Sequence, residues 1–117
     1  MENPNIKIVE DYLDALRIKD LSKAPVDQNV VFADPLTPTS SGRQAWTDFV
    51  SSVLPGINDV RVKQHVAEGD LVVTLWEADT AWGVIPILEY FRLNGGLILE
   101  ARAFFDPRPI TNANVSS

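Results

Sequence analysis

The chain lacks cysteine altogether and has one histidine among its 117 residues. Without cysteine it cannot form a disulfide, a thiolate nucleophile or a thiolate metal site. A single histidine also disfavours zinc, which proteins hold mainly with several histidine and cysteine side chains. We therefore expect neither a metal site nor covalent chemistry through sulfur.

Long apolar runs and basic clusters are also missing. No apolar stretch reaches the roughly 18 residues of a membrane span, and residues 1–5 (Met-Glu-Asn-Pro-Asn) lack the basic and apolar regions of a secretion signal. The net charge is −6, the isoelectric point is near 4.6, and the ten Lys and Arg residues are scattered. These features disfavour binding to nucleic acid or to a membrane, and we expect a cytoplasmic protein.

A hydrophobic content of 45% is enough for one core in a chain of this length. A domain of this size buries roughly two thirds of the surface that its unfolded chain exposes. No internal repeat divides the sequence. Residues 1–117 are therefore expected to form a single domain, in which residues 107–117 are a mobile or loosely docked tail.

The first half of the sequence predicts two amphipathic helices. Apolar residues between positions 5 and 19 fall on a single helical stripe. Residues 20–28 allow a short helix interrupted near a proline, residues 29–34 read as a short strand, and a loop rich in Pro, Thr and Ser follows. The residues Ser41-Gly-Arg-Gln44 match a capping box and predict a second long helix that ends near Pro55.

The second half predicts strands, because the apolar spacing changes to a period of two after Gly56. Turn residues at 68–70 and 94–96 indicate hairpins. The four predicted strands cover residues 60–67, 71–81, 84–93 and 97–105. Helices followed by hairpins indicate an α+β fold, a cone-shaped barrel in which a curved antiparallel sheet wraps around the N-terminal helices and leaves a cavity between helix and sheet.

Two carboxyl groups occupy unusual positions in this pattern. Asp34 closes a short apolar strand and precedes Pro35, which keeps Asp34 extended or in a turn. Glu89 lies inside the strand 84–93, where alternation places it on the same face as Ile87 and Phe91. A lone carboxyl among apolar neighbours stays protonated and can then donate a hydrogen bond near neutral pH.

Other interpretations of these carboxyl groups stay open at the level of sequence. Asp34 also fits a turn former that bonds to nearby backbone amides. Glu89 also fits an ion pair with an arginine on an adjacent strand, or a register in which Leu88 and Tyr90 point inward instead. The sequence alone does not fix that register.

Tyr12 lies on the buried stripe of the first predicted helix, so its hydroxyl needs a partner: solvent, a backbone carbonyl or a ligand oxygen. Core packing alone also explains Tyr12.

His65 shares its predicted strand face with Arg61 and Lys63, which indicates a surface histidine. We expect an aromatic wall that binds a flat apolar ligand, formed by Phe32, Trp46, Phe49, Trp76, Trp82, Phe91 and Phe105. Large rings, Phe104 included, also fill the core of a small domain.

Three short segments carry a resemblance to a known superfamily. They are residues 12–20 (Tyr-Leu-Asp-Ala-Leu-Arg-Ile-Lys-Asp), 32–35 (Phe-Ala-Asp-Pro) and 87–93 (Ile-Leu-Glu-Tyr-Phe-Arg-Leu). Together they resemble the nuclear transport factor 2-like superfamily, particularly ketosteroid isomerases and SnoaL-like polyketide cyclases, over residues 5 to about 107. The resemblance implies that Tyr12 donates to a substrate carbonyl, that Asp34 is the proton-shuttling base, and that Glu89 replaces the protonated aspartic acid of the oxyanion hole.

The sequence departs from these relatives in two places. Val50 stands where the isomerases have a second tyrosine that supports the first, so the resemblance implies a shorter hydrogen-bond network around Tyr12. Limonene epoxide hydrolases share the fold but need an Asp-Arg-Asp arrangement. Ala103 stands in place of their last-strand aspartate, and no arginine lies two residues before Glu89, so epoxide hydrolysis is disfavoured.

These observations lead to two expectations about function. The first is an isomerase- or cyclase-type enzyme that needs no metal or organic cofactor: Asp34 removes a proton alpha to the carbonyl of a small apolar ligand, while Tyr12 and protonated Glu89 stabilise the enolate. The alternative is a non-catalytic ligand-binding or dimerisation module of the same fold. In either case we expect a homodimer through the sheet, because Leu88 and Tyr90 would form an exposed apolar patch.

Overall fold

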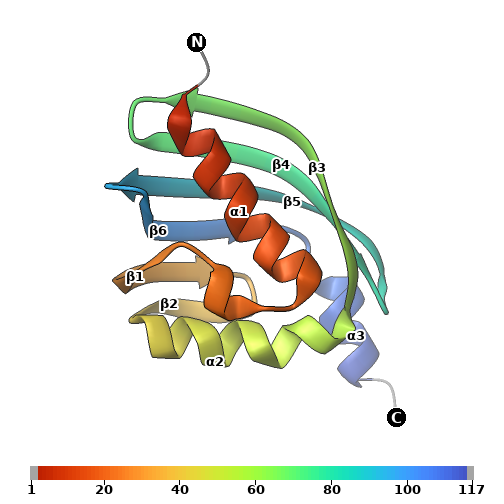
Figure 1. Cartoon of the computed structure of the whole chain (residues 1–117). Coiled ribbons are helices and arrows are strands. Elements are labelled where there is room, and N and C mark those ends of the chain that lie inside the picture. The colour runs from red at the N-terminus through yellow and green to blue at the C-terminus, as the bar shows by residue number, and fades with distance from the viewer. Residues whose placement is uncertain (1–2, 116–117) are drawn as a thin grey trace.

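A curved sheet wraps around helix α1 in the computed structural model, which describes residues 3–115 (Figure 1). In chain order, with η marking a 3-10 helix, the elements are α1 (Pro4–Ile18), η1 (Leu21–Lys23), β1 (Val26–Asp34), β2 (Thr37–Ser41), α2 (Arg43–Val53), η2 (Leu54–Gly56), β3 (Ile57–Glu68), β4 (Leu71–Thr80), β5 (Gly83–Asn94), β6 (Leu97–Phe104) and α3 (Arg108–Val115). Within the described residues, no helix is long and apolar enough to cross a membrane. The α+β class predicted from the sequence is confirmed.

Helix α1 begins and ends at local signals in the sequence. The side chain of Asn3 accepts a hydrogen bond from the backbone N–H of Asn5, and Pro4 occupies the first turn. At the other end, Lys19 adopts the left-handed conformation (φ 61°) that closes the helix. The predicted apolar stripe is the buried face of this helix. Its buried residues are Val9, Tyr12, Leu13, Ala15 and Leu16.

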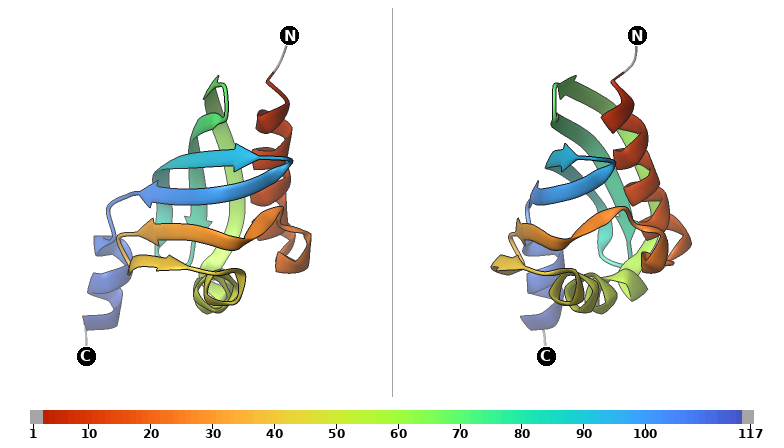
Figure 2. Two further views of the ribbon diagram at one scale, coloured as in Figure 1. Left: turned by 90° about the vertical axis from the view of Figure 1, so that its left-hand side faces the viewer. Right: turned by 60° about the vertical axis from the view of Figure 1, so that its left-hand side comes forward.

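The six strands follow the order β2-β1-β6-β5-β4-β3, so β2 and β3 are the edges and the sheet is not closed into a barrel. Neighbouring strands are antiparallel except β1 and β6, which pair in parallel. Figure 2 shows the sheet curving around the helices. Trp46, Leu13 and Phe91, from α2, α1 and β5, are among the largest fully buried side chains. The core therefore fills the space between the sheet and the helices.

The structure corrects three local predictions in the first half of the chain. The loop predicted after Asp34 is the short edge strand β2, and β1 begins at Val26, so only η1 remains of the helix predicted over residues 20–28. The capping box is also wrong, because α2 begins after Gly42 with no side-chain cap. Ser41 is still part of β2, and Gly42 makes the change of direction with a φ of 105°, which favours glycine.

The predicted surface position of His65 is wrong, because β3 contains a bulge. The register between β3 and β4 shifts between Val62 and Gln64, so the inward alternation continues at His65 and Ala67 instead of at Gln64. The His65 side chain is 11% exposed. Its Nδ1 lies 2.7 Å from the hydroxyl oxygen of Thr74, and its Nε2 lies 3.4 Å from Glu10 on α1. His65 therefore joins helix α1 to the sheet.

The segment expected as a mobile or loosely docked tail contains the helix α3. Ile110 of α3 is partly buried and packs against the core, so this helix adds to the shared hydrophobic cluster. Residues 1, 2, 116 and 117 of the expected single domain lie outside the described residues. Mobility of the tail stays a prediction.

Candidate functional site

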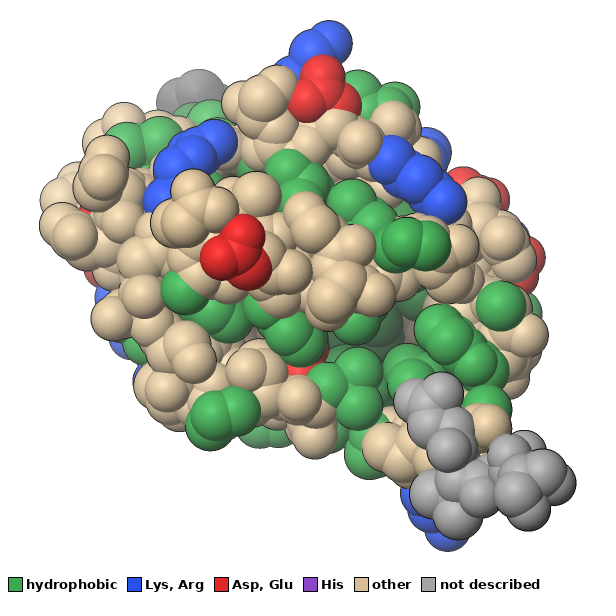
Figure 3. Space-filling view, turned by 90° about the horizontal axis from the view of Figure 1, so that it is seen from below, with side chains coloured by type: hydrophobic (Ala, Val, Ile, Leu, Met, Phe, Trp, Pro, Cys, Tyr) green, Lys and Arg blue, Asp and Glu red, His purple; other side chains and the backbone are tan. Residues whose placement is uncertain are grey.

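A cavity of about 110 Å³ lies between the concave face of the sheet and the helices α1 and α2. Figure 3 shows a hollow on the surface seen from below, rimmed by hydrophobic side chains. Most of the cavity wall is apolar or aromatic. Besides the indoles, its polar members are Tyr12, Asp34, Thr80 and Glu89. A wall of this composition suits an apolar ligand that carries few polar atoms.

Asp34 reaches the cavity from the end of β1. Its Oδ1 accepts a hydrogen bond from the backbone N–H of Leu36 at 2.7 Å, in the turn that leads to β2. The carboxyl group therefore organises the turn and also lines the cavity, while its role as a base stays a prediction. Burial raises the pKa of Asp34 above its ordinary value, while hydrogen bonds from the N–H groups of Leu36 and Thr37 act in the opposite direction.

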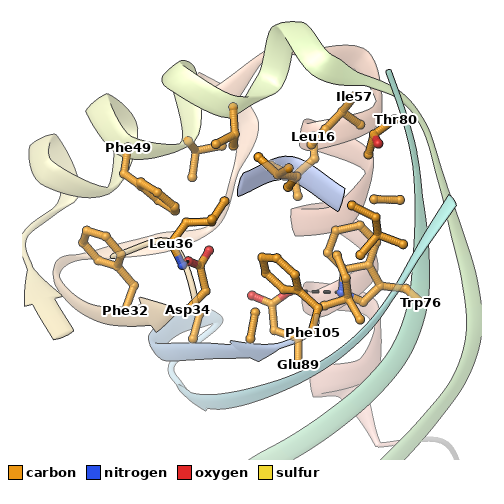
Figure 4. Close-up of a pocket in the computed structure, with 18 of the residues that line it drawn as sticks. Leu16, Phe32, Asp34, Leu36, Phe49, Ile57, Trp76, Thr80, Glu89 and Phe105 are labelled. Carbon is orange, nitrogen blue, oxygen red and sulfur yellow. Dashed lines mark hydrogen bonds between the residues drawn. The ribbon is translucent and has the colours of Figure 1, made fainter. Parts of the chain in front are cut away.

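Glu89 lies on the inward face of β5, as the alternation predicts, and is only 5% exposed. The indole Nε1–H of Trp76 donates a hydrogen bond to its Oε1 at 3.1 Å (Figure 4). Burial raises the pKa of Glu89 to about 8; the Trp76 hydrogen bond opposes this rise and the charge of Asp34 adds to it. Glu89 is therefore mostly protonated at neutral pH.

The alternative ion pair for Glu89 is absent from the described residues. Arg92 of β5 pairs with Asp70 and Glu100, and Arg102 of β6 pairs with Glu100. These arginines lie on the outer side of the sheet, because the alternation that turns Glu89 inward turns them outward. Glu89 thus faces the cavity without a basic partner among the residues that the structure describes.

Tyr12 is fully enclosed between α1, α2 and the sheet. Its hydroxyl oxygen accepts a hydrogen bond from the indole Nε1–H of Trp46 at 3.4 Å, and its ring meets Phe91 edge-on at 5.2 Å between centroids. Burial raises the pKa of Tyr12 well above its ordinary value, and the nearby charge of Glu89 adds to the effect. The phenol therefore keeps its proton. Trp46 supplies the support for Tyr12 that Val50 cannot give.

The fold thus brings together the three side chains singled out from the sequence. Asp34 and Glu89 point into the same space in Figure 4, and the charge of Asp34 raises the pKa values of both Tyr12 and Glu89. The sequence did not reveal that Trp46 and Trp76 are hydrogen-bond donors to two of them. From the sequence, Trp46 and Trp76 were expected only to line the cavity. The acceptor that each indole N–H meets depends on how the elements pack together.

The predicted aromatic wall is largely present. The residues of this set that line the cavity are Phe32, Trp46, Phe49, Trp76, Trp82 and Phe105. Phe91 is a correction, since it is fully buried behind Tyr12 and does not line the cavity. Phe104 is another, since it points to the outer face of the sheet and is 59% exposed. The sequence missed Ile110 of α3, because nothing in its pattern indicates where the C-terminal segment folds back.

The described residues contain no group of three or more His, Cys, Asp or Glu side chains that could hold a metal ion. The two carboxyl groups of the cavity, Asp34 and Glu89, come from different strands and meet aromatic and aliphatic neighbours. Their surroundings favour proton transfer and hydrogen bonding to an organic ligand over metal coordination.

Comparison with solved structures shows the nuclear transport factor 2-like fold, which is also described as cystatin-like. A protein provisionally named SnoaL-like polyketide cyclase from Jannaschia sp. CCS1 superposes with a TM-score of 0.82 at 18% identity, over 100% of this chain and 98% of that one. A protein provisionally named ketosteroid isomerase from Kribbella flavida superposes with a TM-score of 0.74 at 16% identity, over 86% of this chain and 76% of that one. An LEH-like epoxide hydrolase from M. tuberculosis superposes with a TM-score of 0.73 at 18% identity, over 92% of this chain and 86% of that one.

These identities are low, so the likeness shows the fold alone. No curated protein sequence matches the chain. A family model does match it, over residues 1–116, and carries the description "Domain of unknown function (DUF4904)". On this match across nearly its whole length, the chain belongs to the DUF4904 family.

Proposed function

We propose that the chain is an isomerase- or cyclase-type enzyme that removes a proton alpha to the carbonyl of a small apolar ligand and stabilises the resulting enolate. One observation carries the proposal: a carboxyl base and two proton-holding donors meet in one apolar cavity. The isomerase and cyclase names carried by structures of the same fold support this class of reaction.

Asp34 is the base in this scheme. It belongs to the end of a strand, so its backbone is held by pairing to β2 and by the Leu36 N–H that binds one carboxyl oxygen. The N–H of Thr37 also donates to this carboxyl group, whose two oxygens together can accept further hydrogen bonds from a ligand. Because the pKa of Asp34 is raised, its carboxylate is a stronger base than an exposed aspartate, which favours proton transfer from carbon.

Tyr12 and Glu89 are the donors to the ligand oxygen. Each has one of its hydrogen-bonding positions filled by an indole, Trp46 for Tyr12 and Trp76 for Glu89. These indoles occupy acceptor sites and do not consume the two O–H groups. Tyr12 and Glu89 also hydrogen-bond to each other, and the ligand oxygen is expected to replace that bond by accepting from both. Donors fixed in an apolar cavity stabilise a developing oxyanion strongly, by a factor of about 10² to 10³ for each important donor.

The proposed step conserves atoms and electrons without a cofactor. The C–H bond alpha to the carbonyl breaks, and its proton passes to the Asp34 carboxylate. The electron pair moves into the new carbon–carbon double bond as the carbonyl becomes an enolate oxygen held by Tyr12 and Glu89. In a ligand with a β,γ carbon–carbon double bond, Asp34 then returns the proton to the γ carbon, which gives isomerisation. In a ligand with a second carbonyl, the enolate carbon attacks that carbonyl and the proton of Asp34 passes to the new alkoxide oxygen, which gives cyclisation.

The first experiment titrates the protein with a phenol whose ionised form resembles an enolate. We expect saturable binding as the phenolate, seen in its absorbance and in quenching of tryptophan fluorescence. Asp34→Asn is expected to strengthen binding by about tenfold, because it removes a negative charge beside the phenolate while keeping the shape. Tyr12→Phe is expected to weaken it, because one donor is lost.

The control for this titration is Asp48→Asn, which neutralises a carboxyl group on the exposed side of α2 and is expected to leave phenol binding unchanged. A phenol that binds only in its neutral form, or no saturable binding at all, would contradict the proposal. In either of those cases the function must be sought among the binding and assembly roles of the same fold.

An assembly role is the second candidate, and a specific surface favours it. Leu75, Leu88 and Phe104 are directly paired across β4, β5 and β6 on the outer face of the sheet, and each is more than 40% exposed. Such a row of neighbouring apolar side chains is unusual on a monomer. We propose that this row pairs with the same row of a second copy of the chain.

A further inference from the structure

The tip of the β4–β5 hairpin is hydrogen-bonded to the end of η2, the 3-10 helix that follows α2. The backbone N–H of Ala81 donates to the carbonyl oxygen of Gly56 at 2.8 Å. Within the turn, the hydroxyl of Thr80 accepts from the N–H of Trp82 at 3.0 Å and donates to the carbonyl of Gly83 at 2.7 Å. Each of these bonds restricts the backbone of the turn that carries Trp82.

The Trp82 ring packs directly against Gly56. A Cβ atom at position 56 would come within 2.4 Å of two carbons of the indole ring, far closer than non-bonded atoms approach. Gly56 is not among the glycines with positive φ. Glycine is therefore needed here for space and not for backbone conformation, and any larger residue would push the ring from its position.

The cavity has a polar end and an apolar end. Glu89 and Trp76 mark the polar end, and the inward rows of β4 and β5 run from there along the cavity wall to Thr80 and Trp82. At roughly 3.3 Å per residue, the hairpin tip lies about 20 Å from Glu89 along the strand. In Figure 4, Thr80 and Ile57 lie across the cavity from Asp34 and Glu89.

The wall next to Trp82 is apolar. The Trp82 ring lies against Gly56, and the following residue, Ile57, also lines the cavity. Neither Trp82 nor Ile57 carries a charge, so this end offers nothing to a charged ligand group. A ligand that places its oxygen at Glu89 would extend an uncharged body toward Trp82.

We infer that Trp82, seated on Gly56, is the end wall that determines the length of ligand the cavity accepts. The favoured ligand is elongated, with one carbonyl or phenolic oxygen at one end and an uncharged apolar body. The orientation of this ligand rests on the proposed function, whereas the position of the wall does not. The experiment therefore uses one ligand series with the oxygen and one without it.

The test measures dissociation constants for 4-n-alkylphenols and for n-alkylbenzenes of increasing chain length. Affinity for the unmodified protein is expected to rise about three- to fourfold per methylene until the chain meets the wall, and then to stop rising. In Trp82→Ala the rise is expected to continue for two or more further methylenes. The shortest members of each series should bind within about twofold of the unmodified protein, because their contacts lie far from Trp82.

Gly56→Ala provides a second, independent variant, since it moves the wall without replacing any residue that lines the cavity. It is expected to displace the indole, to shift the emission of Trp82 and to change the chain length at which affinity stops rising. The matched control is Ser51→Ala on the exposed side of α2, which should change neither the tryptophan emission nor the chain length at which affinity stops rising. Trp82→Phe should keep the wall nearly in place, because a large ring remains.

Each result decides between the two proposals. The same limiting chain length in the unmodified protein and in Trp82→Ala overturns the end wall, and so does the lack of binding by both series. A shifted limit in the alkylbenzenes without any preference for phenols, and without phenol ionisation, supports the end wall but removes the proposed enolate site. A shifted limit together with bound phenolate supports both.

Discussion

Glu89 shows at the scale of a residue how burial converts an ordinary carboxyl group into a hydrogen-bond donor. Its neighbours along β5 are apolar and the indole of Trp76 donates to one of its oxygens. An indole N–H would favour the ionised carboxylate, yet burial has the larger effect and the pKa rises to about 8. The protonated form is therefore a property of the cavity and not of the residue.

The raised pKa predicts how stability changes with pH. Between about pH 4.5 and pH 8, the folded protein keeps the Glu89 proton while the unfolded chain releases it, so the free energy of unfolding falls as pH rises through this window. In Glu89→Gln this contribution to the slope is expected to disappear. The variant should match the unmodified protein near pH 5 and exceed its stability by on the order of a few kcal/mol at pH 8.

Urea denaturation at several pH values measures this difference. Glu77→Gln is a suitable control, because Glu77 pairs with Arg61 and Lys63 on the outer face of the sheet. Parallel stability curves for the Glu89→Gln variant and the unmodified protein across pH 5 to 9 would show that Glu89 does not hold its proton in the fold.

At the scale of an element, the bulge in β3 decides which side chains meet helix α1. It turns His65 inward, where Thr74 of β4 and Glu10 of α1 are its partners. Thr74 is completely buried, so its hydroxyl has no access to water. This polar contact lies between α1 and the sheet, and it helps to seat the helix that carries Tyr12.

We predict that Thr74→Val lowers the free energy of unfolding by about 1 to 3 kcal/mol, because the shape is kept while His65 loses its hydrogen-bond partner. The control is Thr39→Val on the edge strand β2, where Thr39 is exposed and its hydroxyl accepts from Arg102; a change within about 0.5 kcal/mol is expected there. Chemical denaturation gives both values. Equal effects at the two positions would mean that the His65 contact contributes little.

At the scale of the whole molecule, the outer face of the sheet predicts a homodimer. Light scattering at micromolar concentration is expected to give twice the chain mass of 13.0 kDa. Leu88→Lys places a charge in the middle of the apolar row and is expected to give the single-chain mass. Leu97→Lys, at an exposed apolar residue outside the row, should leave the dimer intact. A monomer in the unmodified protein removes this candidate role.

Patterns that repeat along the chain predicted most of the elements. The stripe of α1, the later helix and the four hairpin-linked strands follow from periods of 3.6 and 2. Predictions failed where a single residue breaks the period. The bulge near Gln64 reversed the inferred face of His65, and Gly42 replaced the expected cap of α2. Such irregularities depend on the strand or helix next door, which local spacing does not reveal.

The sequence by itself determined the α+β class and most of the elements, and it placed Tyr12 on a helical apolar stripe, Asp34 at a strand end and Glu89 in an alternating strand whose inward face it left open. Only the tertiary structure decided that the three share a cavity, that Trp46 and Trp76 donate to two of them, and that Trp82 rests on Gly56. The physical reason is that burial follows from local periodicity, whereas hydrogen-bond partners, desolvation and close contacts depend on segments far apart in the chain.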